Sequence, residues 1–165
     1  MNSADAWASC ARRVGILVDS NLLVLLVVGS VNRKRIGQFK RTSSFVEADF
    51  DLLRDLLGNS RIFSLAHVLG EVSNLTDLSG AELSEAREVL KRTINSIEEP
   101  SMPSLTAVQN LVYARLGLTD AAIVESARTH GCAVLTNDLD LTLALQQQNL
   151  PAANFTHYRA SILGL

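Results

Sequence analysis

Acidic residues stand directly after two short apolar segments that have the composition of buried strands. Asp19 follows Val14–Val18, and Asp138 and Asp140 follow Ala133–Thr136. Functional sites in open parallel sheets lie beyond the carboxyl ends of the strands, so these carboxylates occupy positions where chemistry is expected. Asp19 also interrupts an otherwise apolar stretch, and a carboxylate in such a place needs hydrogen-bond partners or a metal ion.

Two further acidic residues are placed on expected helices. Asp120 opens a helix, where the positive end of the helix dipole favours an anion, and Glu71 lies in the middle of a mostly apolar helix. Taken alone, Asp120 also suits a helix-start residue and Glu71 a solvated side chain. Asp138 and Asp140 together equally suit the acidic first turn of a helix.

Strands and helices are expected to alternate along the chain. The expected strands are Val14–Val18, Arg61–Leu65, Cys132–Thr136 and Ala152–Thr156. The expected helices are Ser20–Val28, Ala48–Leu57, Ala66–Leu75, Ser79–Ile97, Ser104–Leu116, Asp120–Thr129 and Asp138–Gln148, with a helical turn in the tail. This alternation predicts an α/β fold, a three-layer α/β/α sandwich with a central, mainly parallel sheet of four to five strands.

The expected domain organisation is a single domain over residues 14–165. Residues 1–13 show no clear period and are expected to form an N-terminal extension. Gly29 is expected to stop the first helix after Asp19, and residues 29–46 are polar and basic and are expected to form a loop. The sequence Ser79-Gly80-Ala81-Glu82 has the form of a capping box at a helix start.

The composition excludes several classes of protein. The chain has 165 residues, of which 47% are hydrophobic and 19% charged, so it is long and apolar enough to bury a core and is not a disordered chain. Aromatic residues make up only 5%, which argues against a nucleic-acid reader built on stacked rings. The net charge of −2 excludes a globally basic binder. The charge is uneven, however, because residues 1–44 carry a balance of +5.

One apolar segment, residues 14–31, resembles a membrane anchor at first sight. Its longest unbroken apolar run is Leu22–Val28, far short of the roughly 20 residues that a span needs. Asp19 stands inside the segment, and a central aspartate opposes insertion. We therefore expect a buried strand and a buried helix. The two cysteines, Cys10 and Cys132, lack nearby partners and are expected to be reduced thiols in a cytoplasm.

Four short motifs in order resemble those of the PIN-domain nucleases. The motifs are Val18-Asp19-Ser20-Asn21, Glu71 within His67–Val72, Leu118-Thr119-Asp120-Ala121-Ala122, and Leu135-Thr136-Asn137-Asp138-Leu139-Asp140. Each motif falls on the type of element that the family pattern requires. The resemblance covers about residues 14–156 and extends to the bacterial single-domain, VapC-like toxin ribonucleases.

The resemblance implies a compact α/β/α domain that hydrolyses phosphodiester bonds of RNA with Mg²⁺ or Mn²⁺. It also implies the toxin of a toxin–antitoxin pair, with an antitoxin protein and a second copy of the chain as partners, in the cytoplasm. Carboxylates that converge in one cleft repel one another, and a hard divalent cation relieves that repulsion. The alternative hypothesis is a catalytically silent PIN-like scaffold that binds RNA or a protein.

The resemblance also assigns roles to individual residues. Asp19, Glu71, Asp120 and Asp138 are the expected catalytic residues and, with Asp140, the expected metal ligands. Asn21 and Thr136 are expected to support them through hydrogen bonds, with helix capping and strand packing as the structural alternative. The expected RNA contacts are the basic residues Arg33, Lys34, Arg35, Lys40 and Arg41, which have no acidic residue among them. The alternative for this basic segment is a solvated loop.

Overall fold

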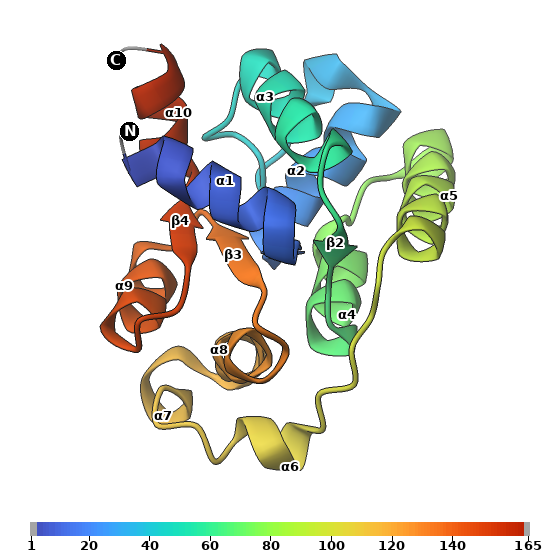
Figure 1. Ribbon diagram of the computed structural model, residues 1–165. Helices are drawn as coiled ribbons and strands as arrows, with labels where there is room; N and C mark the ends of the chain where they lie inside the picture. The colour runs from blue at the N-terminus through green and yellow to red at the C-terminus, as the bar shows by residue number, and fades with distance from the viewer. Residues whose placement is uncertain (1–2, 164–165) are drawn as a thin grey trace.

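A four-stranded parallel sheet forms the centre of the computed structural model, which describes residues 3–163 (Figure 1). Its strands are β1 (Ile16–Val18), β2 (Ile62–Phe63), β3 (Ala133–Thr136) and β4 (Ala152–Asn154), in the order β2-β1-β3-β4. All three neighbouring pairs are parallel, and an isolated parallel bridge joins Phe63 to Glu98 beyond β2. Helices on both sides of the sheet complete the expected three-layer α/β/α architecture.

The helices follow the order that the sequence predicts. They are α1 (Ser3–Val14), α2 (Ser20–Val31), α3 (Glu47–Gly58), α4 (Ala66–Leu75), α5 (Gly80–Ser96), α6 (Ser104–Ala107), α7 (Tyr113–Leu116), α8 (Leu118–His130), α9 (Leu139–Gln147) and α10 (Phe155–Leu163), with a 3-10 turn at Arg33–Arg35. The prediction for α4 is confirmed to the residue, and the bounds of α3, α8 and α9 differ by one or two residues. The expected helical turn of the tail is the longer α10.

The N-terminal segment differs from the expected aperiodic extension. Within residues 3–14 it forms α1, whose face of Trp7, Ala8 and Ala11 is buried against the core. The helix contacts β3 and β4, and the Trp7 ring meets the Tyr158 ring edge-on with centroids 5.8 Å apart. Positions 7, 8 and 11 have the spacing of one helical face, so the sequence carries a period that the expectation of an aperiodic extension overlooked. Residues 1 and 2 lie outside the described part of the chain.

Three local expectations about helix ends are wrong. Gly29 does not stop α2 but lies inside it. A glycine is needed there because the helix passes so close to Phe50 that a side chain would collide with the ring. The expected helix over residues 104–116 is broken into α6 and α7, since the Asn110 side chain accepts a hydrogen bond from the Val112 N–H (3.1 Å) and so favours a turn. Ser79 makes no side-chain capping bond at the start of α5.

The basic segment is more regular than the expected loop over residues 29–46. Its first residues finish α2, and the 3-10 turn and further turns follow. Ile36, Phe39 and Phe45 from this segment are buried in the core, which holds the backbone against α2 and α3. Further along, an ion pair of 2.8 Å between Arg159 of α10 and the buried Asp49 of α3 fixes the C-terminal helix to the same region.

The apolar stretch that resembled an anchor is buried inside the domain. Residues 16–18 form β1 at the centre of the sheet, and α2 is buried along most of its length. Across residues 3–163, no helix combines the length and the apolar character needed to cross a membrane. Cys10 and Cys132 are free, and burial raises the pKa of the Cys132 thiol to about 11, which keeps it protonated and unreactive.

Two glycine substitutions are expected to have opposite effects on stability. A Cβ at Gly29 would lie 2.4 Å from the Phe50 ring, so Gly29→Ala is expected to destabilise the protein by about 1–3 kcal/mol through overpacking. At Gly70 in α4 a Cβ would meet nothing within 4 Å, so Gly70→Ala is expected to stabilise by about 0.5–1 kcal/mol. Urea denaturation measures both. Equal effects of the two substitutions would contradict the close approach of α2 to Phe50.

Candidate functional site

Asp19 stands at the carboxyl end of the buried strand β1 and is only 5% exposed. Its Oδ1 accepts a hydrogen bond from the Ser20 N–H (2.6 Å), and its Oδ2 accepts one from the Thr136 hydroxyl (2.6 Å). Ser20 begins α2 and Thr136 ends β3, so the carboxylate is held from two elements. A buried carboxylate requires such donors, because burial without them is costly.

Thr136 connects two of the expected site residues. It is completely buried, donates to Asp19, and accepts a hydrogen bond from the Asp138 N–H (2.9 Å). Asp138 caps α9, since its Oδ1 accepts from the Leu141 N–H (3.0 Å). The ends of β1 and β3 are neighbours in the sheet, which is why residues far apart in the sequence meet here. Asp138 therefore acts as a helix cap, while Thr136 supports the Asp19 carboxylate as the sequence analysis expected.

Glu71 is joined to the same group by a residue that the sequence analysis did not single out. The Ser20 hydroxyl donates to Glu71 Oε2 (2.7 Å), while the Ser20 N–H donates to Asp19. Ser20 thus connects α4 to the end of β1. The available signal was its position in the first motif, which places a hydroxyl next to the carboxylate at the end of the strand.

The four carboxylates of Asp19, Glu71, Asp120 and Asp138 interact electrostatically. The pKa of Asp120 is raised to about 7, mainly by burial and additionally by the charges of Asp19, Asp138 and Glu71. Burial also raises the pKa of Asp19; the hydrogen bonds from Thr136 and Ser20 oppose that rise, and the charges of Glu71 and Asp138 add to it. The fold therefore brings these four predicted residues into one negatively charged group at the carboxyl edge of the sheet.

The donor chemistry of this group suits a hard divalent cation. Mg²⁺ and Mn²⁺ prefer oxygen ligands, and a cation would relieve the repulsion that raises the pKa of Asp120. In the described part of the chain, however, no group of three or more His, Cys, Asp or Glu side chains is arranged so as to hold a metal ion. Charge and donor type thus fit a metal ion, whereas the side-chain positions do not form a complete ligand set.

Two expected site residues lie apart from this group. Asp140 is exposed in the first turn of α9 and is not among the charges that act on Asp19 or Asp120. Asn21 is exposed at the start of α2, and among residues 3–163 no hydrogen bond holds its side chain. The structure thus brings together Asp19, Glu71, Asp120, Asp138 and Thr136, with Asp140 and Asn21 at the outside.

Three of the five expected RNA-contacting residues form ion pairs within the domain. Arg33 lies 2.6 Å from Asp51 and 3.2 Å from Glu47, and Arg35 lies 3.0 Å from Glu82. Lys40 lies 2.7 Å from Asp77. The sequence shows no acid among these basic residues, but the fold supplies acids from α3, α5 and the turn after α4.

Lys34 and Arg41 differ from the other three basic residues. Both side chains are exposed, and neither forms an ion pair with another residue in the described range 3–163. Arg41 acts only weakly on Asp77, whose pKa is lowered mainly by its hydrogen bond with Lys40 and least by the charge of Arg41. Of the basic set, these two residues are the ones whose charge is available to an external anion.

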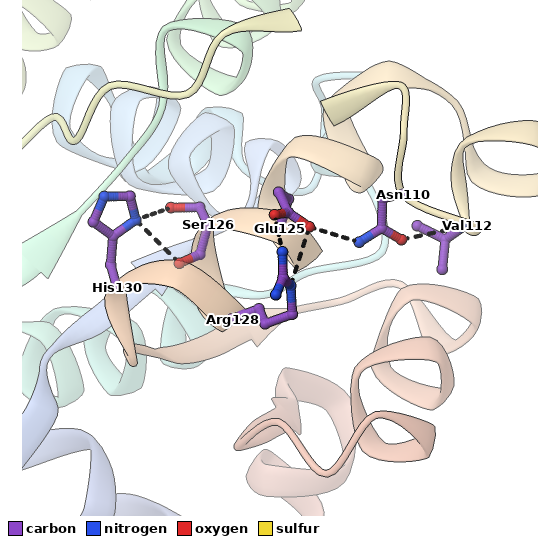
Figure 2. A network of polar contacts seen from close by, with 6 residues as sticks. All are labelled: Asn110, Val112, Glu125, Ser126, Arg128 and His130. Carbon is purple, nitrogen blue, oxygen red and sulfur yellow. Dashed lines mark hydrogen bonds and ion pairs between the residues drawn. The ribbon is translucent and has the colours of Figure 1, made fainter. Parts of the chain in front are cut away.

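A polar network centred on Glu125 fixes the helix that carries Asp120 (Figure 2). Glu125 is buried in α8 and accepts hydrogen bonds from Asn110 (3.1 Å) and Arg128 (3.3 Å to Nε). The same asparagine receives the Val112 N–H, so the turn between α6 and α7 is held against α8. The hydrogen bond from Arg128 lowers the pKa of Glu125, which keeps this carboxylate ionised.

The fold and the site together agree with a match to a known family. The family model described as PIN domain matches residues 16–144, which is more than half of the chain. The chain therefore belongs to the PIN domain family, and membership indicates a nuclease, a hydrolase that acts on phosphodiester bonds. Among curated proteins, no sequence matches the chain.

The pKa of Asp120 leads to a prediction about stability. In the folded state it is about 7, above the ordinary 3.8. The stabilising contribution of this proton is complete below about pH 4 and is lost as pH rises through about 7. Without added divalent cation, we expect the free energy of unfolding to fall across this window, and Asp120→Asn to reduce that fall, because Asp19, whose pKa is also raised, contributes to it as well. Urea denaturation at successive pH values measures it.

The control for this measurement is Asp55→Asn, which changes an exposed aspartate of α3. It is expected to leave the fall between about pH 4 and 7 unchanged. The carboxylates whose pKa values are lowered by ion pairs, such as Asp51 and Asp77, lose their stabilising effect only at lower pH. If the fall persisted in full in Asp120→Asn, Asp120 would not be its source.

Proposed function

We propose that the chain is a metal-dependent endoribonuclease that hydrolyses RNA phosphodiester bonds with Mg²⁺ or Mn²⁺. The observation that carries this proposal is the gathering of Asp19, Glu71, Asp120 and Asp138 at one edge of the sheet, where burial first, and then the charges of the other three carboxylates, raise the pKa of Asp120 to about 7. Buried carboxylates with perturbed pKa values that gather in one place are typical of functional sites. Membership of a nuclease family supports the phosphodiester as the target.

The carboxylates and the residues that hydrogen-bond to them have different proposed roles. Asp19, Asp120 and Asp138 are the proposed metal ligands, with Glu71 as a further ligand or as the group that orients the attacking water. A bound divalent cation supplies charge neutralisation at the phosphate and lowers the pKa of bound water. Thr136 and Ser20 hold the Asp19 carboxylate in one orientation through their hydrogen bonds. Asp140 stays a predicted ligand that its exposed position does not support.

Substrate binding is proposed to draw on the exposed basic residues. Lys34 and Arg41 carry charge that no ion pair within residues 3–163 neutralises, so they are the proposed phosphate contacts. Arg33, Arg35 and Lys40 would have to leave their acidic partners before they bound RNA. They are therefore the weaker candidates among the predicted contacts.

The partner predictions rest on the resemblance to VapC-like toxins. A toxin role, an antitoxin partner, a homodimer and a cytoplasmic location stay predictions. Large apolar side chains are exposed between α6 and the start of α8, among them Leu105 (76%), Leu111 (95%) and Tyr113 (44%). Exposed apolar surface of this kind is typical of protein contact sites and supports a partner at this part of the domain.

Loss of Asp19 is expected to abolish metal-dependent cleavage. With single-stranded RNA and Mn²⁺, we expect Asp19→Asn to reduce the cleavage rate by about 100-fold or more. Loss of a residue that only hydrogen-bonds to a metal ligand already reduces activity by about 10–100-fold, and Asp19 is a proposed ligand itself. EDTA is expected to stop the wild-type reaction, and excess Mn²⁺ to restore it. Gel assays of a labelled RNA measure the rate.

The matched control is Asp55→Asn, an exposed aspartate outside the carboxylate group. It is expected to cleave at the wild-type rate. Equal activity of wild type, Asp19→Asn and the EDTA-treated protein would refute the metal mechanism. RNA binding that survives Asp19→Asn, with no cleavage under any metal, would instead establish the silent scaffold.

Salt dependence tests the proposed RNA contacts. In the presence of EDTA, Lys34→Gln and Arg41→Gln are each expected to weaken binding of single-stranded RNA. Each is also expected to reduce the slope of log K against log salt by about 0.7, since each phosphate contact releases a counterion. Lys91→Gln, an exposed lysine of α5, is the control and is expected to bind as wild type does. An unchanged slope in both variants would remove this segment from the interface.

A further inference from the structure

A pocket of about 220 Å³ lies between α9, α10, β4 and α1, outside the carboxylate group. Leu139, Thr142, Leu143 and Gln146 line it from one face of α9, at the spacing of successive helical turns. Tyr158 from α10 and Trp7 from α1 also line it, and their rings pack edge to face. Drug-sized ligands take pockets from about 300 Å³ upward, so this one suits a smaller group.

The pocket adjoins the proposed catalytic edge. Leu139 directly follows Asp138, and the Thr142 hydroxyl donates to the Asp138 carbonyl oxygen (2.6 Å). Beside the pocket, the Thr156 hydroxyl at the start of α10 donates to Asn137 Oδ1 (2.7 Å), and Asn137 directly precedes Asp138. The end of the pocket that Leu139 and Thr142 line is therefore within about one helical turn of Asp138, a proposed metal ligand.

One wall of the pocket carries a hydrogen-bond donor without an acceptor. Trp7 is 7% exposed, and its indole N–H is buried and has no hydrogen-bond partner among residues 3–163. A buried indole N–H normally finds a partner, and leaving it unsatisfied costs about 1–3 kcal/mol. A residue that lines a pocket with room for a ligand thus keeps a hydrogen-bond donor without a partner.

The other lining groups narrow the chemistry of that ligand. None of the described residues that line the pocket is Lys, Arg, Asp or Glu, and His157 contributes an imidazole, so the lining carries no permanent charge that would hold a phosphate or a cation. It offers instead the carboxamides of Asn154 and Gln146, two aromatic rings, and the aliphatic side chains of Leu139 and Leu143. Flat rings beside neutral hydrogen-bonding groups are the surroundings in which proteins hold an unstacked nucleobase.

We propose that this pocket binds one base of the RNA strand whose phosphate lies at the carboxylate group, and that it thereby sets a base preference near the cleavage site. The inference rests on the proposed ribonuclease function, which it deepens. The unused Trp7 N–H donates to an acceptor on the edge of the base, while Leu139 and Leu143 cover its face. The strand passes from the pocket over Asn137 and Thr156 to Asp138.

The protein carries its own probe for this site, because Trp7 is its only tryptophan. Uridine, cytidine, adenosine and guanosine are titrated separately into the full chain without metal, and the Trp7 fluorescence is followed. We expect a saturable change with at least one nucleoside. Leu143→Arg is expected to weaken that binding about tenfold or more, in line with the loss of one base contact.

Ile94→Arg is the matched control, since Ile94 in α5 is 40% exposed and Leu143 in α9 is 42% exposed. It is expected to bind nucleosides as wild type does. Gln146→Ala, at an exposed position of the lining, guards against a folding defect in Leu143→Arg and is expected to weaken binding or change the preferred base. Trp7→Phe, followed by calorimetry, is expected to weaken binding because it keeps a ring and loses the N–H.

The outcomes separate this inference from the proposed function. If the chain cleaves RNA but no nucleoside changes the Trp7 fluorescence, the pocket proposal is overturned and the ribonuclease proposal stands. Equal nucleoside binding by wild type, Leu143→Arg and Gln146→Ala also overturns the pocket proposal. If nucleosides bind in a pocket-dependent way but no RNA is cleaved under any metal, the base site stands and the ribonuclease proposal fails.

Discussion

The burial of a carboxylate at the end of a central strand is the constraint on which the site depends. Asp19 is 5% exposed and remains there because the Ser20 N–H and the Thr136 hydroxyl each donate to one of its oxygens. Those donors come from the start of α2 and the end of β3, so the carboxylate is satisfied only when β1 and β3 are paired in register. Thr136 also accepts a hydrogen bond from the Asp138 N–H, and the Ser20 hydroxyl donates to Glu71, so both residues are held beside Asp19.

The distribution of charge follows from this arrangement. The carboxylates at the sheet edge destabilise one another, as the raised pKa of Asp120 indicates, whereas most acids elsewhere in the domain are paired with arginine or lysine. The basic residues after α2 serve largely to attach that segment to α3 and α5. The net charge of −2 therefore includes four carboxylates at the sheet edge that form no ion pair with arginine or lysine among residues 3–163.

The sequence was informative where a local pattern and a long-range contact agreed. The apolar runs before Asp19 and Asp138 predicted β1 and β3, and the rule that sites lie beyond parallel strand ends predicted that these carboxylates meet. The α1 helix was not predicted, although Trp7, Ala8 and Ala11 have the spacing of one helical face. The partners of Arg33 and Lys40 were unpredictable, since the acids they contact lie 18 and 37 residues away and only the fold brings them near.

The hydrogen bond between Thr136 and Asp19 spans 117 residues and has a consequence for synthesis of the chain. Strand β3 leaves the ribosome well after β1, and a parallel strand cannot pair before its partner exists. Until residue 136 has emerged, the Asp19 carboxylate lacks one of its two donors and Asp138 is absent altogether. The carboxylate group therefore cannot assemble on a nascent chain until residues 136–138 have been synthesised, so its formation is coupled to the pairing of β3 with β1.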